Sequence, residues 1–427
     1  MKLRRSFSLL TAAVICTGML SGCAGKTEES SAVGGDTSVT ITEASTADPI
    51  DTEMTPLEFT AGIKVGWNLG NTLDATGTGL DSEMSWGNPK TTEDMILKLK
   101  SAGFNAVRIP TTWEKHMDES YTIDAAWMAR VQEIVDYAYD NDMYAILNMH
   151  HEEWYYPDNA NKDAASARLE ACWTQIAEHF SDYDERLIFE GMNEPRWKNT
   201  SFEWNGGNDE GRAVVNHLNN VFVDAVRATG GNNEHRFLMV CPYGANSGES
   251  ALAALELPDD DRLIVSVHAY IPYGFALAEN GTTKWVADRG NCTTEIDQLA
   301  EVLDRLFISK GIAVIIGETG AQNRENEEFR CNWAEYYFGK FAEMGIPCFW
   351  WDNGAFFSGE KFGLLDRRLL QFKYPLLTES IMKAVYGEDA DFDIRDESKC
   401  AYSGCLNEVD DPGTDVYCKL HAAEDAA

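Results

Sequence analysis

Short apolar runs recur between residues 56 and 388, and each is followed by polar residues and then by a segment with helical spacing. Uninterrupted apolar runs are typical of parallel strands that are covered on both faces. Segments such as 125–141 and 294–311 repeat apolar residues at intervals of three and four, which predicts amphipathic helices. The eight runs that we interpret as strands are 62–70, 106–110, 144–151, 187–195, 236–242, 263–270, 313–320 and 348–354.

Eight strand–helix units predict one α/β domain, a (β/α)8 TIM barrel, over residues 56–388. The alternative for alternating strands and helices is an open, doubly wound sheet. Such a sheet normally carries a glycine-rich phosphate-binding turn after its first strand. Here the first run continues into WNLGNTLDA without that glycine spacing, so the closed barrel is the favoured architecture.

The N-terminal segment has the pattern of an export signal. A basic start, MKLRR, precedes a short apolar stretch and then LSGC, which resembles the lipobox of bacterial lipoproteins. We predict a lipoprotein signal peptide over residues 1–22, a lipidated Cys23 and a flexible tether over residues 23–55. An ordinary signal peptide with a chance cysteine is the alternative. The expected location is extracytoplasmic, either lipid-anchored at a bacterial cell surface or secreted.

The C-terminal segment, residues 389–427, is acidic and is too short to form a core. Three cysteines and one histidine follow the spacing C-x4-C-x12-C-x2-H, and four such ligands suit tetrahedral zinc. The alternative is one disulfide with a cysteine left over, because export permits disulfides. The candidate zinc ligands are Cys400, Cys405, Cys418 and His421.

The net charge of the chain indicates which classes of molecule it can bind. The chain has 70 acidic and 35 basic residues, for a formal charge of −35. A nucleic-acid-binding protein needs a basic surface, so we exclude that class. The excess of acidic residues favours a soluble protein that acts on a neutral partner.

Polar and aromatic side chains gather where the predicted strands end. Catalytic groups of such barrels lie at the C-terminal ends of the strands, so these residues are expected to share one rim. They are Trp67 and Asn68, Arg108, His150 and His151, Asn193 and Glu194, His268 and Tyr270, Glu318, and Trp350 and Trp351.

Two carboxylates on different strand ends are what glycoside hydrolysis needs. One gives a proton to the leaving oxygen, and the other attacks the anomeric carbon or activates water. Glu194 and Glu318 are the candidates. A gap of about 5–5.5 Å between them would indicate retention of configuration, and a gap of about 6.5–9.5 Å would indicate inversion. Glu190 is expected to be a buried, paired charge. A metal site at His150, His151 and Glu152 is disfavoured because HHEE lacks the zinc-helix spacing.

The neighbouring residues suggest supporting roles. Arg108, His268 and Tyr270 have hydrogen-bond donors for one ionised carboxylate. Asn193 is a candidate for binding the sugar 2-hydroxyl. The candidate apolar platforms for sugar rings are Trp351, Trp67 and, on a loop, Trp86.

These motifs resemble glycoside hydrolase family 5, and most closely its subfamily of bacterial endoglucanases that includes xyloglucanases and lichenases. The matching stretches, within residues 57–387, are GWNLGNTLDA, SWGNP, GFNAVRIPTTW, ILNMHHE, IFEGMNEPR, SVHAYIPYGFA, IIGETGA and WWDNG. The resemblance implies a retaining endo-β-1,4-glucanase in which Glu194 is the acid/base and Glu318 the nucleophile. It further implies that Arg108 and Tyr270 hold Glu318, and that the cleavage subsite is lined by His150, Asn193, His268 and Trp351. The family's usual Glu-Phe-Gly is Glu318-Thr319-Gly320 here, which affects an expected subsite contact but not the nucleophile.

The resemblance implies no cofactor for catalysis, and we expect a monomer. The expected partners are a β-glucan polysaccharide and, through the lipid, a membrane. Xyloglucan or mixed-linkage glucan as the preferred substrate is one alternative. A surface protein that binds polysaccharide without cutting it is an alternative of another class.

Overall fold

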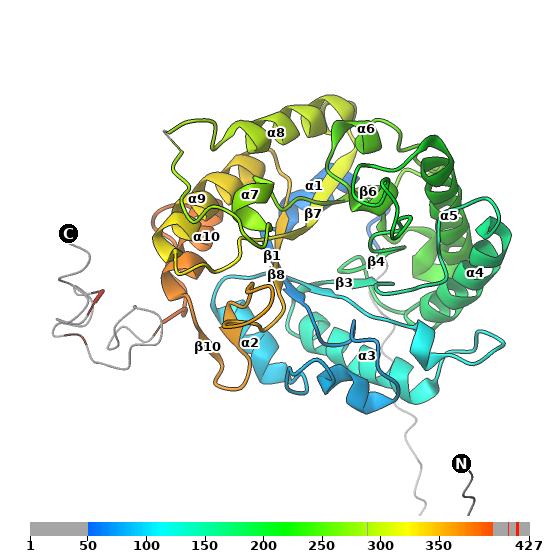
Figure 1. The fold of residues 1–427 in the computed structure, drawn as a ribbon. Helices are drawn as coiled ribbons and strands as arrows, with labels where there is room; N and C mark the ends of the chain where they lie inside the picture. The colour runs from blue at the N-terminus through cyan, green and yellow to red at the C-terminus, as the bar shows by residue number, and fades with distance from the viewer. Residues whose placement is uncertain (1–49, 288, 396–408, 410–415, 418–427) are drawn as a thin grey trace, which may run out of the picture. The chain divides into compact units, whose positions relative to one another are not determined.

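A computed structural model of the chain describes residues 50–287, 289–395, 409, 416 and 417. Eight parallel strands form a closed barrel in which the last strand, β8, pairs with the first, β1 (Figure 1). This confirms the predicted (β/α)8 barrel and excludes the open sheet. The strands are β1 Val65–Leu69, β2 Ala106–Ile109, β3 Tyr144–Asn148, β4 Leu187–Glu190, β5 Leu238–Val240, β6 Leu263–His268, β7 Ala313–Thr319 and β8 Cys348–Asp352.

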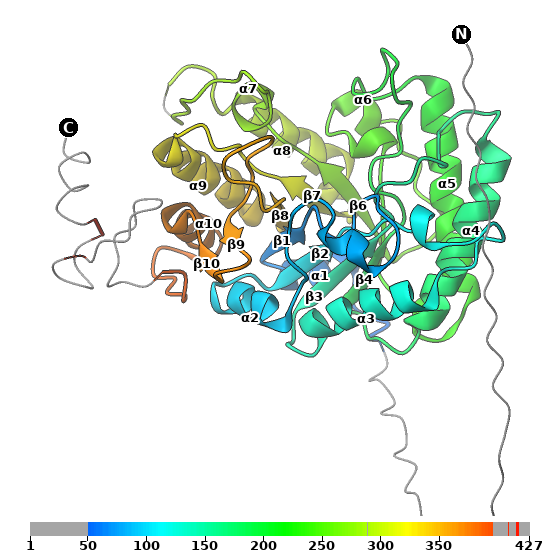
Figure 2. The same cartoon turned by 60° about the horizontal axis from the view of Figure 1, so that its bottom comes forward.

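Helices follow the strands and form the outer layer of the barrel (Figures 1 and 2). Polar side chains cap the starts of three of them: Thr55 accepts from Glu58 N at α1, Asp124 accepts from Trp127 N at α3, and Asn208 accepts from Gly211 N at α5. The helices are α1 Pro56–Gly62, α2 Glu93–Ser101, α3 Ala125–Tyr139, α4 Lys162–His179, α5 Asp209–Ala228, α6 Glu249–Leu252, α7 Tyr273–Ala276, α8 Thr294–Leu306, α9 Glu327–Glu343 and α10 Pro375–Tyr386. A small antiparallel pair, β9 Leu365–Asp366 and β10 Gln371–Phe372, lies between β8 and α10.

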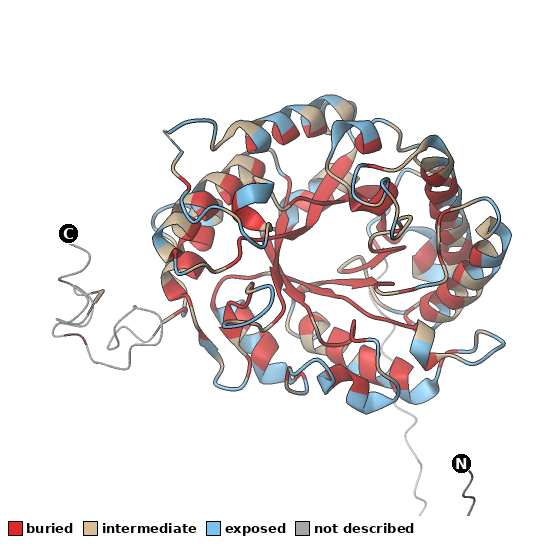
Figure 3. Ribbon diagram, in the orientation of Figure 1, coloured by how far each residue is buried: buried red, intermediate tan, exposed pale blue. Residues whose placement is uncertain are grey.

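The alternation of side chains along each strand divides the core into two parts. Outward-facing residues pack against the helices, whose inner faces are buried (Figure 3). Inward-facing apolar residues fill the end of the barrel where the strands begin. Phe59 of α1 joins them by stacking on Phe237, with 4.0 Å between ring centroids. Because this end of the barrel is packed with apolar groups, polar inward-facing residues are left for the opposite end, where the strands terminate.

Both boundaries that composition suggested for the barrel domain need correction. At the N-terminal side, Arg262 donates to the carbonyls of Asp51, Thr52 and Met54, so the last residues of the predicted tether pack on the barrel. At the C-terminal side, Ile394 is buried and Asp393 pairs with Lys98 of α2. The packed unit therefore includes residues 51–54 and 393–394, beyond both predicted boundaries. Composition alone could not locate these contacts because they join residues far apart in the chain.

Among the helices that the structure describes, none is both long and apolar enough to cross a membrane. The predicted signal peptide, Cys23, most of the tether, and the four candidate zinc ligands lie outside the described residues.

Candidate active site

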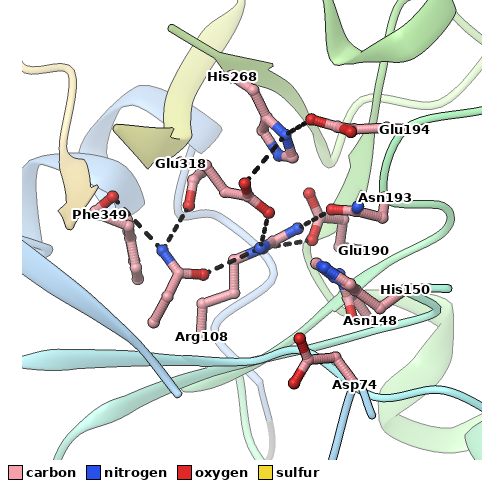
Figure 4. A network of polar contacts seen from close by, with 12 residues as sticks. Asp74, Arg108, Asn148, His150, Glu190, Asn193, Glu194, His268, Glu318 and Phe349 are labelled. Carbon is pink, nitrogen blue, oxygen red and sulfur yellow. Dashed lines mark hydrogen bonds and ion pairs between the residues drawn. The ribbon is translucent and has the colours of Figure 1, made fainter. Parts of the chain in front are cut away.

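Arg108 is the centre of the polar network at the strand ends (Figure 4). It is fully buried, and its guanidinium donates to Glu190 Oε2 at 2.7 Å, Glu318 Oε1 at 2.8 Å, Asn193 Oδ1 at 2.7 Å and Asn68 Oδ1 at 2.9 Å. Burial lowers the pKa of Arg108, but the charges of Glu190 and Glu318 outweigh burial and raise it above its ordinary value. A permanent positive charge therefore lies beneath the site.

Glu318 lies near the end of β7 with a donor on each carboxylate oxygen. Arg108 binds Oε1, and the Tyr270 hydroxyl donates to Oε2 at 3.0 Å. Burial, and then the charges of Glu318 and Glu194, raise the pKa of Tyr270 well above its ordinary value, so its hydroxyl remains a donor. Two donors, one on each oxygen, fix the direction of the Glu318 carboxylate.

Glu194 lies on an irregular segment that follows β4, which ends at Glu190. Gly191 N donates to Met239 O of β5, and Asn193 N donates to Met149 O beyond β3, so the segment is held from both sides. A Cβ on Gly191 would lie 2.5 Å from the Phe222 ring of α5, which explains glycine at this close approach. These contacts hold residues 191–194 so that the Glu194 carboxyl lies over the barrel and not inside it.

His268 lies between the two candidate carboxylates. Its Nδ1 is 2.8 Å from Glu194 Oε1 and 3.6 Å from Glu318 Oε2. Ligating atoms of these three residues all lie within 4.8 Å of one another. Burial lowers the pKa of His268, but the charge of Glu318 and the hydrogen bond and charge of Glu194 outweigh it and raise the pKa. This close approach of the carboxylates fits the short gap of retaining enzymes, about 5–5.5 Å, and not the wider gap of inverting ones.

His150 is oriented by Asn148, a residue that the sequence pattern did not single out. Asn148 Oδ1 accepts from Thr111 N, so its amide nitrogen faces His150 Nδ1 at 3.1 Å. His150 Nδ1 must then accept, and the ring proton sits on Nε2. Burial, helped by the charges of His151 and Arg108, lowers the pKa of His150 well below its ordinary value. His150 is therefore a neutral donor for a hydroxyl group.

The tryptophans divide according to the face of the strand on which they lie. Trp351 faces the site and stacks on His150, with 5.7 Å between the rings, whereas Trp350 is fully buried against the helices. Trp67 was predicted to be a sugar platform, and this is wrong: it is fully buried and donates through Nε1 to Asp352. Neighbouring residues of a strand face opposite ways, and in β1 the inward residue is Asn68.

The remaining candidates occupy the rim and the layer below it. Asn68 is fully buried and donates to the carbonyl of Gly317, so it supports Arg108 rather than contacting a ligand. His151 is partly exposed, and its Nε2 is 4.0 Å from Asp74 Oδ2. Burial lowers the pKa of His151 to about 4, so it too is neutral. Trp86 is 43% exposed, and its ring centroid lies 5.6 Å from that of His151.

Two clusters among the described residues bring three possible metal ligands together: Asp74 with His150 and His151, and Glu194 with His268 and Glu318. In the first, each Asp74 oxygen already accepts a backbone N–H, from Thr72 or Asn71. The second is the pair of catalytic candidates with the histidine between them. The described cysteines are all free thiols: Cys172, Cys241, Cys292, Cys331 and Cys348.

Arg196 and Glu203 are polar residues beside Glu194 that the sequence analysis missed. Arg196 Nη1 lies 3.2 Å from Glu194 Oε2, and Arg196 Nε lies 3.3 Å from Glu203 Oε1. Arg196 lines the pocket beside Glu194 together with His150, His151, Tyr155 and Lys198. The sequence could have indicated Arg196, because it directly follows Asn-Glu-Pro. Its contact with Glu203 could not be predicted, because it depends on how the following loop folds.

Comparison with known proteins agrees with this geometry. The sequence profile of the family described as Cellulase (glycosyl hydrolase family 5) matches residues 73–357. Endoglucanase B of Ruminococcus albus is 46% identical over 404 residues, which cover 90% of this chain and 97% of the relative. Among solved structures, a GH5-4 broad specificity endoglucanase from Ruminococcus champanellensis, with bound cellotriose, is 47% identical with a TM-score of 0.76. It matches 78% of this chain and 99% of its own.

A second structure, a GH5 xyloglucan-specific endo-beta-1,4-glucanase from a metagenomic library in complex with cellotriose, is 45% identical with a TM-score of 0.74. It matches 76% of this chain and 98% of its own. The family profile covers well over half of the chain, and each of these relatives is covered almost completely. The chain belongs to glycoside hydrolase family 5.

Proposed function

We propose that this protein is a retaining endo-β-1,4-glucanase that cuts internal bonds of β-glucan chains by double displacement. The observation that carries the proposal is the approach of Glu194 and Glu318 to the same nitrogen of His268, with ligating oxygens within 4.8 Å of one another. The family and the endoglucanase relatives support the same activity.

In the first half of the reaction, Glu318 attacks the anomeric carbon and forms a covalent glycosyl–enzyme ester. Glu194 gives its proton to the departing glycosidic oxygen at the same time. The two donors on Glu318 hold its carboxylate in a fixed direction, and the neutral His150 and the face of Trp351 are available to the sugar.

In the second half, Glu194 is the carboxylate that removes a proton from water. The water oxygen bonds to the anomeric carbon, and the bond to Glu318 breaks with its electrons returning to the carboxylate. Two inversions at the same carbon retain the configuration. Every proton and electron in this cycle is supplied by the two glutamates, the substrate and water.

The roles of the two glutamates can be separated with small nucleophiles. Both Glu318→Ala and Glu194→Ala are expected to lose more than about 10³-fold of kcat on a soluble β-glucan. Azide added to Glu318→Ala should occupy the nucleophile's place and give an α-glycosyl azide from an activated cellobioside. Azide added to Glu194→Ala should attack the glycosyl–enzyme and give the β-azide. The opposite products would exchange the two assignments.

The preferred glucan requires a panel of substrates. Reducing ends released from carboxymethylcellulose, barley β-glucan, xyloglucan and mannan would be compared at equal mass. We expect cleavage of unsubstituted β-1,4-glucan; a rate on xyloglucan or barley β-glucan that exceeds it tenfold would favour the corresponding alternative. Xyloglucan is included because one similar structure is that of a xyloglucan-specific enzyme.

A non-catalytic polysaccharide-binding protein is the alternative of another class. It would need the cleft and its aromatic groups but not two carboxylates with separate donor sets. Folded wild-type protein that binds glucan and releases no reducing ends from the whole panel would establish this alternative.

We further propose that a lipid on Cys23 anchors the enzyme outside the cytoplasm of a bacterial cell. The basic start, the apolar stretch and LSGC support this. Expression with a radiolabelled fatty acid should label the wild type and leave Cys23→Ser unlabelled and released into the medium. Equal release of both proteins would favour an ordinary signal peptide.

For the C-terminal segment we propose a structural zinc site. The spacing of Cys400, Cys405, Cys418 and His421 supports it. Elemental analysis of purified protein should find about one zinc per chain, and a variant with Ser at Cys400 and Cys405 should lose it. Protein without zinc and with two fewer titratable thiols would favour the disulfide.

A further inference from the structure

Arg196 contacts the candidate acid/base, Glu194, but does not lie at a strand end. It begins the segment 196–207, which joins Pro195 to the cap of α5. Its Nη1 donates both to Glu194 Oε2 at 3.2 Å and to the Glu194 carbonyl at 3.1 Å. The two side chains are 18% and 17% exposed, so the contact lies at the edge of the cleft, where screening by water is incomplete.

Two further residues of the same segment fix the direction of the guanidinium. Glu203 Oε1 lies 3.3 Å from Arg196 Nε, and Glu203 Oε2 accepts from Asn199 N at 2.8 Å. The Trp204 ring lies under the guanidinium, with 4.1 Å from the Arg196 Cζ atom to the ring centroid. A counter-charge on one side and an aromatic face on another hold a long side chain that would otherwise rotate freely.

The segment itself is tied to the loop after β5 at three places. Gly244 N donates to Pro195 O at 2.9 Å, Trp197 N donates to the Tyr243 hydroxyl at 2.6 Å, and Asn246 Nδ2 donates to Trp204 O at 3.1 Å. The arrangement of Arg196, Glu203 and Trp204 is therefore present in the free enzyme and does not wait for a ligand to form it.

We propose that Arg196 is a positioning residue for the acid/base step: held by Glu203 and Trp204, it orients the Glu194 carboxyl and, with Glu203 as counter-charge, sets the electrostatic balance at that carboxyl. The inference rests on the proposed function, because it assigns Arg196 to Glu194 acting as acid and base.

The charge balance at Glu194 has contributions from several elements. Burial raises the pKa of Glu194, but the hydrogen bond and charge of His268, followed by the charge of Arg196, outweigh burial and lower it. The titratable and charged groups that interact with Glu194 are His268, Arg196, His151, Tyr155, Cys241, Tyr270 and Glu360. Glu318 is a further acidic group nearby, since His268 lies close to both carboxylates. Arg196 also has a carboxylate partner of its own, Glu203, away from the two catalytic candidates.

The sign of each variant's effect follows from this balance. Removing the positive charge of Arg196 makes the proton harder to remove from Glu194, so its pKa rises. Removing the negative charge of Glu203 leaves Arg196 uncompensated, so the pKa of Glu194 falls. Glu194 must be protonated for the first half of the reaction, and the loss of kcat/KM at high pH reports this proton. The two variants should therefore move the alkaline limb in opposite directions.

The experiment measures kcat/KM against pH for phenyl cellobioside, whose departing oxygen needs a proton. Arg196→Gln should move the alkaline limb up by about one pH unit, and Glu203→Gln should move it down by about half a unit. Arg196→Lys keeps the charge and should stay within about 0.3 unit of wild type. On dinitrophenyl cellobioside, whose leaving group needs no proton, the limb should be insensitive to all three variants.

A matched control removes an ion pair of the same kind elsewhere. Arg305 of α8 lies 2.6 Å from Glu249 of α6, and Arg305→Gln should leave the profile at the wild-type position. Circular dichroism and thermal melting confirm that each variant is folded. An unmoved limb in Arg196→Gln, or any result for Glu203→Gln other than a downward shift, overturns the inference. Wild-type protein that hydrolyses neither cellobioside nor glucan would instead contradict the proposed function.

Discussion

At the scale of single residues, the site is organised by one buried cation that serves two carboxylates with different tasks. Arg108 binds Glu190 inside the barrel and Glu318 at its mouth. Glu190 has a second donor, Ser266 Oγ, at 2.5 Å, and is fully buried. Glu190 thus matches the expectation of a buried, paired charge, whereas Glu318 also contacts Tyr270 and faces the cleft.

This division predicts different consequences for two conservative substitutions. Tyr270→Phe removes one donor from Glu318 and should lower kcat/KM by about 10–100-fold while the melting temperature changes little. Tyr337→Phe is the matched control: its hydroxyl donates to the Ala269 carbonyl at 2.8 Å and not to the Glu318 carboxylate, and its loss should cost about 1 kcal/mol of unfolding free energy with activity retained. Equal activity of the two variants would contradict the role of Tyr270.

Glu190→Gln should act on stability first. It leaves Arg108 buried with one ionic partner fewer, and breaking a buried ion pair costs about 3 kcal/mol or more. Urea denaturation followed by tryptophan fluorescence measures the change. A variant as stable as wild type would show that Glu318, Asn68 and Asn193 alone satisfy the guanidinium.

At the scale of elements, closure of the barrel depends on how the last strand meets the first. Asp352 ends β8, and its Oδ2 accepts from Trp67 Nε1 of β1 and from the backbone N–H groups of Leu364 and Leu365, each at 2.9 Å. Arg367 adds a bond from Nη1 to Gly70 O at 3.0 Å and stacks on Trp67. A single carboxylate therefore ties β8, β1 and the loop before β9 together.

Asp352→Asn is expected to lower the free energy of unfolding by about 2–4 kcal/mol. The amide nitrogen would face at least one of the buried donors, and burying an unsatisfied donor costs about 1–3 kcal/mol. Trp67→Phe removes only one donor and serves as the control, with a smaller loss, measured in the same denaturation experiment. A larger loss in Trp67→Phe would mean that packing, and not the hydrogen bonds to Asp352, dominates closure.

At the scale of the whole molecule, the packed unit extends beyond the periodic strand–helix pattern at both ends. Phe392 lies against Tyr386, with 5.0 Å between ring centroids, and Arg395 Nε binds Glu379 at 2.7 Å. None of the contacts described for residues 389–395 involves a residue of the cleft. This segment therefore belongs to the stability of the barrel and not to its chemistry.

Two truncations test this boundary. Deletion after Glu388 should lower the free energy of unfolding by about 2 kcal/mol, because Ile394 and Phe392 lose their packing against the barrel. Deletion after Arg395 keeps the contacts of Phe392, Ile394 and Arg395, so it should lose less stability than deletion after Glu388 and retain hydrolysis. Differential scanning calorimetry and glucan hydrolysis provide the two readouts. Loss of hydrolysis on the longer deletion would tie the C-terminal segment to the catalytic unit.

The eight strands, the helices between them and the pair of glutamates follow from the sequence alone, because hydrophobic periodicity is a local property and barrels expose catalytic groups at strand ends. The face of the strand on which each rim residue lies depends on how the barrel closes and is known from the folded structure. Trp67 and Asn68 are neighbours in the chain, yet the first is buried outside the barrel and the second lies beneath the site. The register shift between β6 and β7 at His268 also aligns that residue with Glu318. Contacts such as Arg196 with Glu203 depend on the path of an irregular loop, which hydrophobic periodicity does not encode.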